Sequence, residues 1–344
     1  MSARENIIPV FVPHLGCPNN CVFCNQNRIS GEQTPATAET VHAAVEKSEE
    51  IYPEGTSRQL AFYGGSFTAI PVPEQIELLE AAKIDLDRGV LSSLRLSTRP
   101  DAIDGEVLKR LKHYGVETIE LGAQSLDDEV LSLSGRGHTA EDVANASRMI
   151  KEAGFRLILQ MMTGLPGDTT EKDIATAEKI AALRPDGVRI YPTVIVKDTA
   201  LYDLWKAGKY REHTVEDAVS VCAELLPVFR KAGIPVIRLG LNPTDDLSGG
   251  DACGGAYHPA LGEMVYSRIM RNQAETLLED ANEDYSEVVL GVAPSYISKM
   301  TGQHRCNIDY LKAKFALRSL TVKPAEVLDE EIVILRSIIS NDKI

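Results

Sequence analysis

The sequence predicts an α/β fold: a parallel sheet curved into a partial TIM-like (β/α)6 barrel, followed by a small α+β region. Three observations predict this fold. Short apolar, β-branched runs alternate with amphipathic stretches, the links between them are short, and polar or glycine-rich residues follow the runs. Strand–helix–strand repeats with short links form parallel sheets with right-handed crossovers. Such sheets place their chemistry at the carboxyl ends of the strands.

Six strands and five helices make up the expected barrel. The strands are the apolar runs IIPVFV at 7–12, RQLAFY at 58–63, LSSLRLS at 91–97, VETIEL at 116–121, FRLILQM at 155–161 and DGVRIY at 186–191. The helices have apolar residues three and four positions apart and lie near 38–50, 73–84, 104–113, 140–153 and 171–183. Gly154 ends the fourth helix as a C-cap residue.

The pattern changes after about residue 198, where a different region is expected. Its elements are helices at 199–207 and 214–231, the run PVIRLGLNP at 235–243, a glycine-rich loop, a helix near 260–279, a strand at 286–292 and a mixed tail. We therefore divide the chain into a barrel domain at 1–240 and a C-terminal region at 241–344.

The composition is that of a chain that buries a substantial core. Its 344 residues are 44% hydrophobic and 25% charged, which suits one large domain or two. No run of about eighteen apolar residues is present, and the N-terminal segment lacks the features of a signal peptide. Six cysteines are too few for a disulfide scaffold. We expect a cytoplasmic protein that does not enter a membrane.

The net charge of −14 argues against a dedicated nucleic-acid binder, because phosphate is neutralised by basic surfaces. One local exception is residues 299–323, the basic segment, where six Lys or Arg side chains accompany a single acidic residue, Asp309. Tyr310 and Phe315 lie among them, and aromatic rings stack on bases. Two interpretations stay open: a nucleic-acid contact, or the solvated face of a small region.

Three cysteines lie close together near the start of the chain: Cys17, Cys21 and Cys24, spaced C-x3-C-x2-C. Zinc sites normally take four ligands, and His14 stands three residues before Cys17, so a Cys3His zinc site is one alternative. A redox pair needs only C-x-x-C. Iron–sulfur clusters are held by thiolates of close-set cysteines, and three thiolates on a four-iron cluster leave one iron open to a substrate or cofactor.

This spacing, with Phe23 just before the third cysteine and a strand before the motif, resembles the radical S-adenosylmethionine (SAM) superfamily. The resemblance implies a 4Fe–4S cluster on Cys17, Cys21 and Cys24, whose open iron binds SAM, and it places Phe23 among the cofactor contacts. It also implies reductive cleavage of SAM to a 5′-deoxyadenosyl radical, with a flavodoxin- or ferredoxin-type electron donor. The protein's part is to position and shield that chemistry.

Later motifs agree with this family and imply its SAM contacts. FYGGSF resembles the Gly-Gly-Glu type motif that holds the methionine amino group, with Ser66 in the acidic position, so backbone atoms of Gly64 and Gly65 do this work. Gln124 in IELGAQS resembles the residue that bonds the ribose hydroxyls. MMTGLPGDT, and Tyr191 in RIYP, resemble the segments near the adenine.

Several polar residues near these motifs have two interpretations. Arg136 in SGRGHT either pairs with the SAM carboxylate as a charge-assisted fork or does not touch SAM. Arg99 either contacts a carboxylate or phosphate or forms an ion pair with Asp101. His138 either has a catalytic role or is a partner of the N-terminal cap of the next helix. Three more residues are given no role: Lys197, Cys253 and Cys306.

Longer phrases over roughly residues 7–215 resemble one branch of the superfamily, the catalytic subunit of Elongator, which modifies wobble uridine in tRNA. They include GGSFTAIP, STRPDAID and PDGVRIYPTVIVKDTALYDLWKAGKY. We expect no acetyltransferase domain, since the chain ends before one and shows no acyl-CoA glycine-rich signature. Two phrases also resemble oxygen-independent coproporphyrinogen oxidases, but Gln26 occupies the position of their additional cysteine.

The sequence therefore predicts a radical SAM enzyme with a 4Fe–4S cluster and SAM as cofactors, acting on an unidentified substrate for which a tRNA base is one candidate. One alternative is a radical enzyme for a small metabolite, similar to the porphyrinogen oxidases. A second is a non-catalytic protein that binds zinc or a cluster. The substrate and the oligomeric state do not follow from the sequence.

Overall fold

The computed structural model describes residues 6–12, 21–25, 34–53, 55–241 and 247–339. The chain forms two compact units. The larger unit comprises Met1–Thr214 and Leu225–Tyr257, and the smaller comprises Val215–Glu224 and His258–Ile344. Each unit has its own sheet, and the helix that spans residues 215–231 contributes to both.

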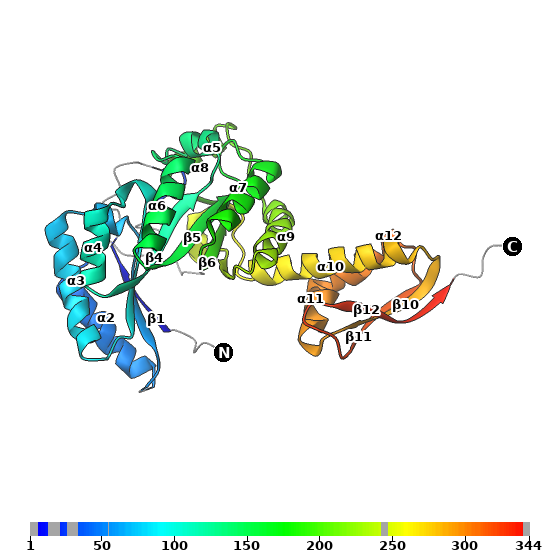
Figure 1. Ribbon diagram of the computed structural model, residues 1–344. Coiled ribbons are helices and arrows are strands. Elements are labelled where there is room, and N and C mark those ends of the chain that lie inside the picture. Colours follow the sequence, from blue (N-terminus) through cyan, green and yellow to red (C-terminus); the bar gives the residue numbers. More distant parts are fainter. Residues whose placement is uncertain (1–5, 13–20, 26–33, 54, 242–246, 340–344) are drawn as a thin grey trace. The chain divides into compact units, whose positions relative to one another are not determined.

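The larger unit is a parallel sheet curled into a half-barrel (Figure 1). Its seven strands lie side by side in chain order, and every neighbouring pair is parallel. They are β1 (Asn6–Phe11), β2 (Arg58–Tyr63), β3 (Ser93–Thr98), β4 (Val116–Gln124), β5 (Arg156–Thr163), β6 (Gly187–Pro192) and β8 (Val236–Leu239). The expected partial barrel is confirmed, and β8 extends the six expected strands by one.

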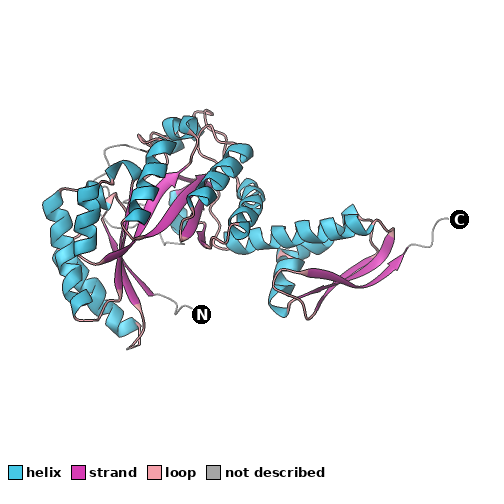
Figure 2. Cartoon of the chain, viewed as in Figure 1, coloured by secondary structure: helices cyan, strands magenta, loops and turns pink. Residues whose placement is uncertain are grey.

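The helices of the larger unit lie along the outside of this sheet (Figure 2). They are α2 (Ala38–Ile51), α3 (Val72–Asp87), α4 (Gly105–His113), α5 (Asp128–Leu133), α6 (Ala140–Glu152), α7 (Thr170–Leu183), α8 (Ala200–Lys206) and α9 (Val215–Lys231). The short helix α5 was not expected, because six residues are too few for a helical period to show. Cys222 is fully buried in α9.

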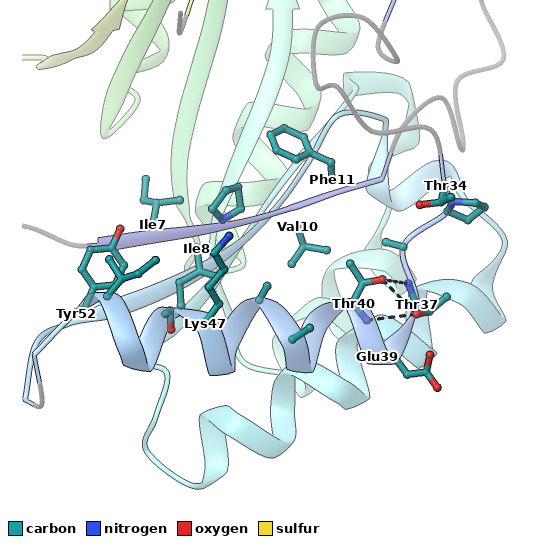
Figure 3. A pocket seen from close by; sticks show the side chains of 17 residues that line it. Ile7, Ile8, Val10, Phe11, Thr34, Thr37, Glu39, Thr40, Lys47 and Tyr52 are labelled. Atoms are coloured by element: carbon teal, nitrogen blue, oxygen red, sulfur yellow. Dashed lines mark hydrogen bonds between the residues drawn. The ribbon is translucent and has the colours of Figure 1, made fainter. Parts of the chain in front are cut away.

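Side chains that cap the helices explain where the helices begin. Thr37 and Thr40 form a reciprocal capping box at the start of α2 (Figure 3). A second capping box, of Thr139 with Asp142, begins α6. One-way side-chain N-caps begin four more helices, after Asp104, Asp127, Thr169 and Thr199. At the other end of α6, Gly154 has a φ of +77°, the left-handed conformation that a helix C-terminus favours and that glycine adopts without strain.

The two faces of the sheet differ in chemistry because side chains alternate along each strand. Leu60, Leu94 and Ile119 are fully buried and belong to the apolar face. Arg95 and Glu120 belong to the opposite face, which carries a buried polar network inside the half-barrel. The polar side chains of this face give the interior of the half-barrel hydrogen-bonding groups that an apolar interior would lack.

The smaller unit is built from one long helix and a three-stranded sheet. The sheet order is β11-β10-β12, with β10 parallel to β11 and antiparallel to β12. Its elements are α10 (Leu261–Ala281), β10 (Tyr285–Val292), α11 (Ile297–Thr301), α12 (Cys306–Lys314), β11 (Ser319–Pro324) and β12 (Ile332–Ile339). Met270, Leu290 and Leu311 are at most 1% exposed and belong to its core.

Two features complete the fold. A short antiparallel pair, β7 (Val194–Val196) with β9 (Ala252–Gly255), adds a second sheet to the larger unit.

Within the described ranges, no helix combines the length and the apolar character needed to span a membrane.

Candidate functional site

The cysteine loop is anchored by two helices that follow strands of the half-barrel. The backbone amide of Val22 donates to the carbonyl of Ser134 at the end of α5 (3.1 Å), and the Val22 carbonyl accepts from Leu201 in α8 (2.7 Å). Cys21 and Cys24 are joined by a backbone hydrogen bond of 3.0 Å. Cys17, the third predicted ligand, lies outside the described residues. Two thiols are therefore held at the carboxyl edge of the sheet, where the sequence predicted a site.

Arg136 joins this loop to the end of β4. Its Nη1 donates to the Cys21 Sγ (3.2 Å), and its Nη2 donates to the carbonyl oxygen of Gly122 (2.8 Å). A side chain at position 122 would crowd this contact, since its Cβ would lie 3.3 Å from Nη2. The guanidinium is thus fixed beside a cysteine predicted to bind the cluster, where it can also form a charge-assisted fork with a carboxylate.

Arg99 and His138 support the segment that carries Arg136. The Arg99 Nη2 donates to the carbonyl of Arg136 (2.9 Å), and its Nε donates to Asp101 (2.5 Å), so the ion-pair interpretation of Arg99 is confirmed. The His138 Nε2 donates to the carbonyl of Ala123 (3.2 Å). Burial and the nearby Arg136 charge lower the pKa of His138 to about 4, so the ring is neutral at pH 7. Both side chains act as supports here.

Gln124 ends β4 in a conformation unusual for a strand. Its φ is +66°, a left-handed value, and the pairing with β5 shifts between Gly122 and Gln124. The buried Gln124 side chain accepts a hydrogen bond from the Nε2 of Gln160 (3.2 Å). Strained backbone of this kind is characteristic of binding sites, and the amide stands at the edge where the ribose contact is predicted.

The glycine pair after β2 lies against the end of β1, just before the cysteine loop begins. Gly64 has a φ of +101°, and a Cβ there would approach the backbone of Val12 to 3.4 Å. The Val12 amide donates to the carbonyl of Tyr63 (2.6 Å). Gly65 follows, and Ser66 is buried at the start of a short 3-10 helix. Gly64 and Gly65 are both partly exposed, so their backbone atoms can be reached from solvent.

Phe23 and Tyr191 lie in one apolar cluster. Both pack against Val130, Met162 and Leu165, which come from α5, β5 and the segment after β5. The cluster brings the cysteine loop together with the ends of two strands. An aromatic wall of this kind can cover a flat base such as adenine.

The segment after β5 is covered by two residues that the sequence did not single out. The Tyr210 hydroxyl donates to the carbonyl of Gly164 (2.6 Å), and the His213 Nε2 lies 3.1 Å from the Thr163 hydroxyl. Gly164 has a φ of +70°, and a Cβ there would lie 2.1 Å from the His213 ring. Only glycine fits beneath the imidazole. The only indication of Tyr210 and His213 in the sequence was that they lie in the segment that follows the sixth expected strand.

Asp168, in this segment, and the buried Asp173, on α7, are neighbouring carboxyl groups whose charges interact. Burial raises the pKa of Asp168, and burial together with the charge of Asp168 raises the pKa of Asp173 much further. Burial and the neighbouring carboxylate charge therefore favour the protonated form of Asp173 at neutral pH.

This pair predicts a pH-dependent stability. An aspartate in the unfolded chain ionises at about pH 4, whereas Asp173 in the folded state keeps its proton to higher pH. The free energy of unfolding of the wild type therefore falls as the pH rises from about 4 toward the folded pKa. In Asp173→Asn the side chain is neutral at every pH, so this pH-dependent loss of stability is absent. The free energy of unfolding of this variant, relative to the wild type, should rise between pH 5 and pH 8 in urea titrations. The exposed Glu178→Gln on the same helix is the control, and an equal shift at every pH would contradict the prediction.

A polar network fills the interior of the half-barrel, and sequence reasoning missed it. The Glu120 Oε1 accepts hydrogen bonds from Arg95 Nη1 (2.8 Å), Arg189 Nη2 (2.8 Å) and the Tyr63 hydroxyl (2.9 Å). The Arg189 Nη1 also donates to the Tyr191 hydroxyl (3.3 Å). We call these five residues the barrel network. The sequence did contain a signal for this network: Arg95, Glu120 and Arg189 each interrupt an apolar strand run. Charges buried in this way are almost always paired.

The barrel network carries a net positive charge and links the interior to the site at the strand ends. Two guanidinium groups face one carboxylate. Burial and the charge of Glu120 raise the pKa of Tyr63, so the phenol keeps its hydrogen. Tyr191 belongs both to this network and to the cluster around Phe23. The interior can therefore donate hydrogen bonds to a polar molecule.

Other features lie apart from this site. A hollow of about 690 Å³ runs between β1 and α2, and none of the predicted site residues lines it (Figure 3). Lys197 faces Asp251 (3.6 Å), and Trp205 packs against the cluster of Ile195 and Leu201. Cys253 and Cys306 are free thiols. Among the described residues, no three His, Cys, Asp or Glu side chains gather as a metal site; Cys17 is not among them.

Two family models match the chain. The Radical SAM superfamily model covers residues 11–180, and the Radical_SAM C-terminal domain model covers residues 185–271. The chain belongs to the radical SAM superfamily. Its radical SAM region contains the cysteine loop, the glycine pair and the end of β4 described above. The family implies a 4Fe–4S cluster and SAM as cofactors and makes this protein an enzyme.

Similar proteins include several that are named for tRNA or for Elongator. A "tRNA uridine(34) acetyltransferase" of Dehalococcoides mccartyi is 25% identical over 285 residues, 71% of this chain and 62% of the relative. Human "Elongator complex protein 3" is 35% identical over 136 residues, 39% of this chain and 25% of the relative. The first of these relatives is thus spanned for less than two thirds of its length.

One solved structure shares the fold of this radical SAM protein. The archaeal Elp3 of Methanocaldococcus infernus, with its N-terminus deleted, aligns with a TM-score of 0.61 at 23% identity, covering 79% of this chain and 64% of that one. At this identity the likeness concerns the fold.

The residues of this radical SAM site fit the groups that the family implies. Cys21 and Cys24 supply soft thiolate donors of the kind that clusters require. The glycine pair exposes backbone atoms, and the absent side chain of Gly122 leaves room for the Arg136 guanidinium. Thiolates, partly exposed glycine backbone and a guanidinium are the kinds of group that a cluster and a molecule with amino and carboxylate groups require.

Proposed function

We propose that Cys17, Cys21 and Cys24 hold a 4Fe–4S cluster and that SAM binds beside it at the carboxyl edge of the half-barrel. The observation that carries this assignment is the Arg136 guanidinium, which contacts the Cys21 sulfur at 3.2 Å and the carbonyl of Gly122 at 2.8 Å. It joins a predicted cluster ligand to the strand whose end is predicted to hold SAM. Gly64, Gly65, Ser66 and Gln124 complete the proposed contacts.

When bound and reduced by one electron, the cluster and SAM would supply a 5′-deoxyadenosyl radical, with methionine released from the broken S–C5′ bond. The chain's own residues bind and orient. Arg136 orients a carboxylate near the sulfur of Cys21, and Arg99 holds the Arg136 backbone in place. Phe23 and Tyr191 exclude water from the apolar side. A low-potential donor of the flavodoxin or ferredoxin type is the proposed electron source.

The proposed substrate is a base of tRNA. In this proposal residues 1–240 carry the radical chemistry, and residues 241–344 form a separate region. Two observations support this class. The relatives that cover most of this chain are named for uridine 34 of tRNA, and the barrel network offers guanidinium and phenol donors to a polar base rather than an apolar interior. A second candidate, a small metabolite, is favoured by the net charge of −14, which repels nucleic acid.

Anaerobic SAM cleavage distinguishes these candidates. The cluster is reconstituted, dithionite and SAM are added, and 5′-deoxyadenosine is quantified with and without unmodified bulk tRNA. We expect cleavage that rises several-fold with tRNA, since a bound substrate consumes the radical and draws the reaction forward. Slow cleavage that tRNA leaves unchanged would contradict the tRNA substrate and favour a small metabolite. No cleavage at a full iron load would contradict the cofactor assignment itself.

A further inference from the structure

The smaller unit contains two helices joined by a tight turn between parallel strands. The chain runs from β10 through α11 to α12 and then to β11, and both helices contact α10 (Figure 1). Residues 302–305, with the sequence Gly-Gln-His-Arg, join the helices, and we call them the helix-junction turn. KH domains bind single-stranded RNA through a Gly-x-x-Gly loop that clamps the backbone of four nucleotides. Here Arg305 stands in the position of the second glycine.

Three of the four residues of the turn have a positive φ, and two of them, His304 and Arg305, are left-handed. The φ angles are +76° at Gly302, +49° at His304 and +65° at Arg305. A Cβ at Gly302 would lie 2.6 Å from the Cys306 sulfur and 3.1 Å from the amide of Asn307. The turn therefore lies close against the first residues of α12, and this path exposes the side chains of Gln303, His304 and Arg305.

A buried asparagine fixes this turn to the neighbouring helix. The Asn307 Nδ2 lies 2.9 Å from the carbonyl of Ser267 in α10, 3.2 Å from that of Lys299 and 3.2 Å from that of Met300 in α11. Asn307 is 2% exposed, and Ile308 beside it belongs to the core. The support is rigid, as a preorganised binding site requires.

The basic segment divides into cations that have carboxylate partners and cations that do not. Lys314 pairs with Glu275 and Glu279, and Arg318 pairs with Glu287. Lys299, before the turn, and Arg305, its last residue, have no carboxylate within ion-pair distance among the described residues. The Arg305 side chain is exposed and Lys299 is partly exposed, so neither charge is neutralised by an ion pair within the part of the chain that the structure describes.

Aromatic rings lie beside Lys299 and beside a second cation, Arg271 of α10. The Lys299 ammonium lies over the rings of Tyr296 (4.3 Å) and Tyr266 (5.0 Å), and the Arg271 guanidinium lies over Tyr310 (4.2 Å). Tyr310 is 37% exposed. Cations interleaved with aromatic rings form the surface on which single strands bind, because phosphates meet the charges and bases stack on the rings.

We propose that the helix-junction turn of the smaller unit, which includes Arg305, together with Lys299 and Tyr310 of the helices that it joins, binds the backbone and bases of single-stranded RNA. The choice of RNA over DNA rests on the proposed function. A chain of net charge −14 can thus engage a polyanion through one local patch, while its acidic remainder limits binding elsewhere. The two family matches end at residue 271, before this turn.

Fluorescence anisotropy with the full chain tests the proposal. The probes are a labelled 12-nucleotide single-stranded RNA of mixed sequence and the DNA of the same sequence, titrated at several salt concentrations. Arg305→Ala and Lys299→Ala should each weaken RNA binding about tenfold and reduce the salt slope by about one. Arg318→Ala, which removes a cation already paired with Glu287 at the other end of α12, is the matched control and should bind as the wild type does.

The outcomes separate this proposal from the proposed function. Absence of RNA binding, equal weakening by Arg318→Ala, or equal affinity for DNA would overturn it. Circular dichroism checks that each variant is folded, and basal 5′-deoxyadenosine formation without RNA should be the same in all three variants. Intact basal cleavage without RNA binding would refute the RNA site alone. RNA binding that depends on Arg305 but leaves SAM cleavage unstimulated would support this site and contradict the tRNA substrate.

Discussion

Cys21→Ala is expected to reduce SAM cleavage to background while leaving the half-barrel folded. A 4Fe–4S cluster held by three thiolates cannot lose one and keep its geometry, and Arg136 would also lose its sulfur partner. Cys21 lies in a loop that backbone hydrogen bonds at Val22 hold in place. The free energy of unfolding should therefore change by only about 0.5 kcal/mol. Iron and sulfide content, 5′-deoxyadenosine yield and thermal unfolding are the measurements.

The control for this variant is Cys306→Ala, which removes an exposed thiol from the smaller unit. It should keep the iron content and the basal SAM cleavage of the wild type. Wild-type activity in Cys21→Ala would contradict the assignment of the cysteine loop as a cluster site.

Glu120→Ala should cost about 3–5 kcal/mol of stability, because it leaves two buried guanidinium groups facing each other without a carboxylate. Arg95 and Arg189 both donate to the same Glu120 oxygen at 2.8 Å. Tyr63 would lose its acceptor as well. Urea denaturation of the full chain measures the change as a lower midpoint.

Two further variants locate this effect. Glu120→Gln keeps the shape and one acceptor oxygen, so its loss should be smaller than that of alanine. Glu117→Ala removes an exposed carboxylate from the same strand and should stay within about 0.5 kcal/mol of the wild type. A loss below about 1 kcal/mol for Glu120→Ala would show that water or other groups solvate the arginines of the barrel network.

The strands and helices of the larger unit could be predicted because local patterns determine them. The expected strands at 58–63 and 186–191 correspond to β2 and β6 within one residue. Threonine and aspartate caps mark the helix starts, and Gly154 marks a helix end. Each of these signals depends on residues a few positions apart, and a single sequence contains them in full.

The smaller unit was harder to predict for a physical reason. Its helices α11 and α12 have five and nine residues, and the turn between them has left-handed residues other than glycine. Short helices show little periodicity, and Asn307 stabilises the turn through carbonyls far away in the chain. Such elements are fixed by packing more than by propensity.

The cysteine spacing, the glycine turns and the order of strands can all be read from the sequence. They were enough to indicate the superfamily and the cofactors that it implies. Tertiary structure decided which side chains meet. It brought Arg136 to Cys21, 115 positions apart, and it gathered Arg95, Glu120 and Arg189 from three strands into one buried network. Local pattern encodes a strand and its face, but a partner across the barrel depends on register and curvature. Those are properties of the whole sheet, and no short stretch of sequence contains them.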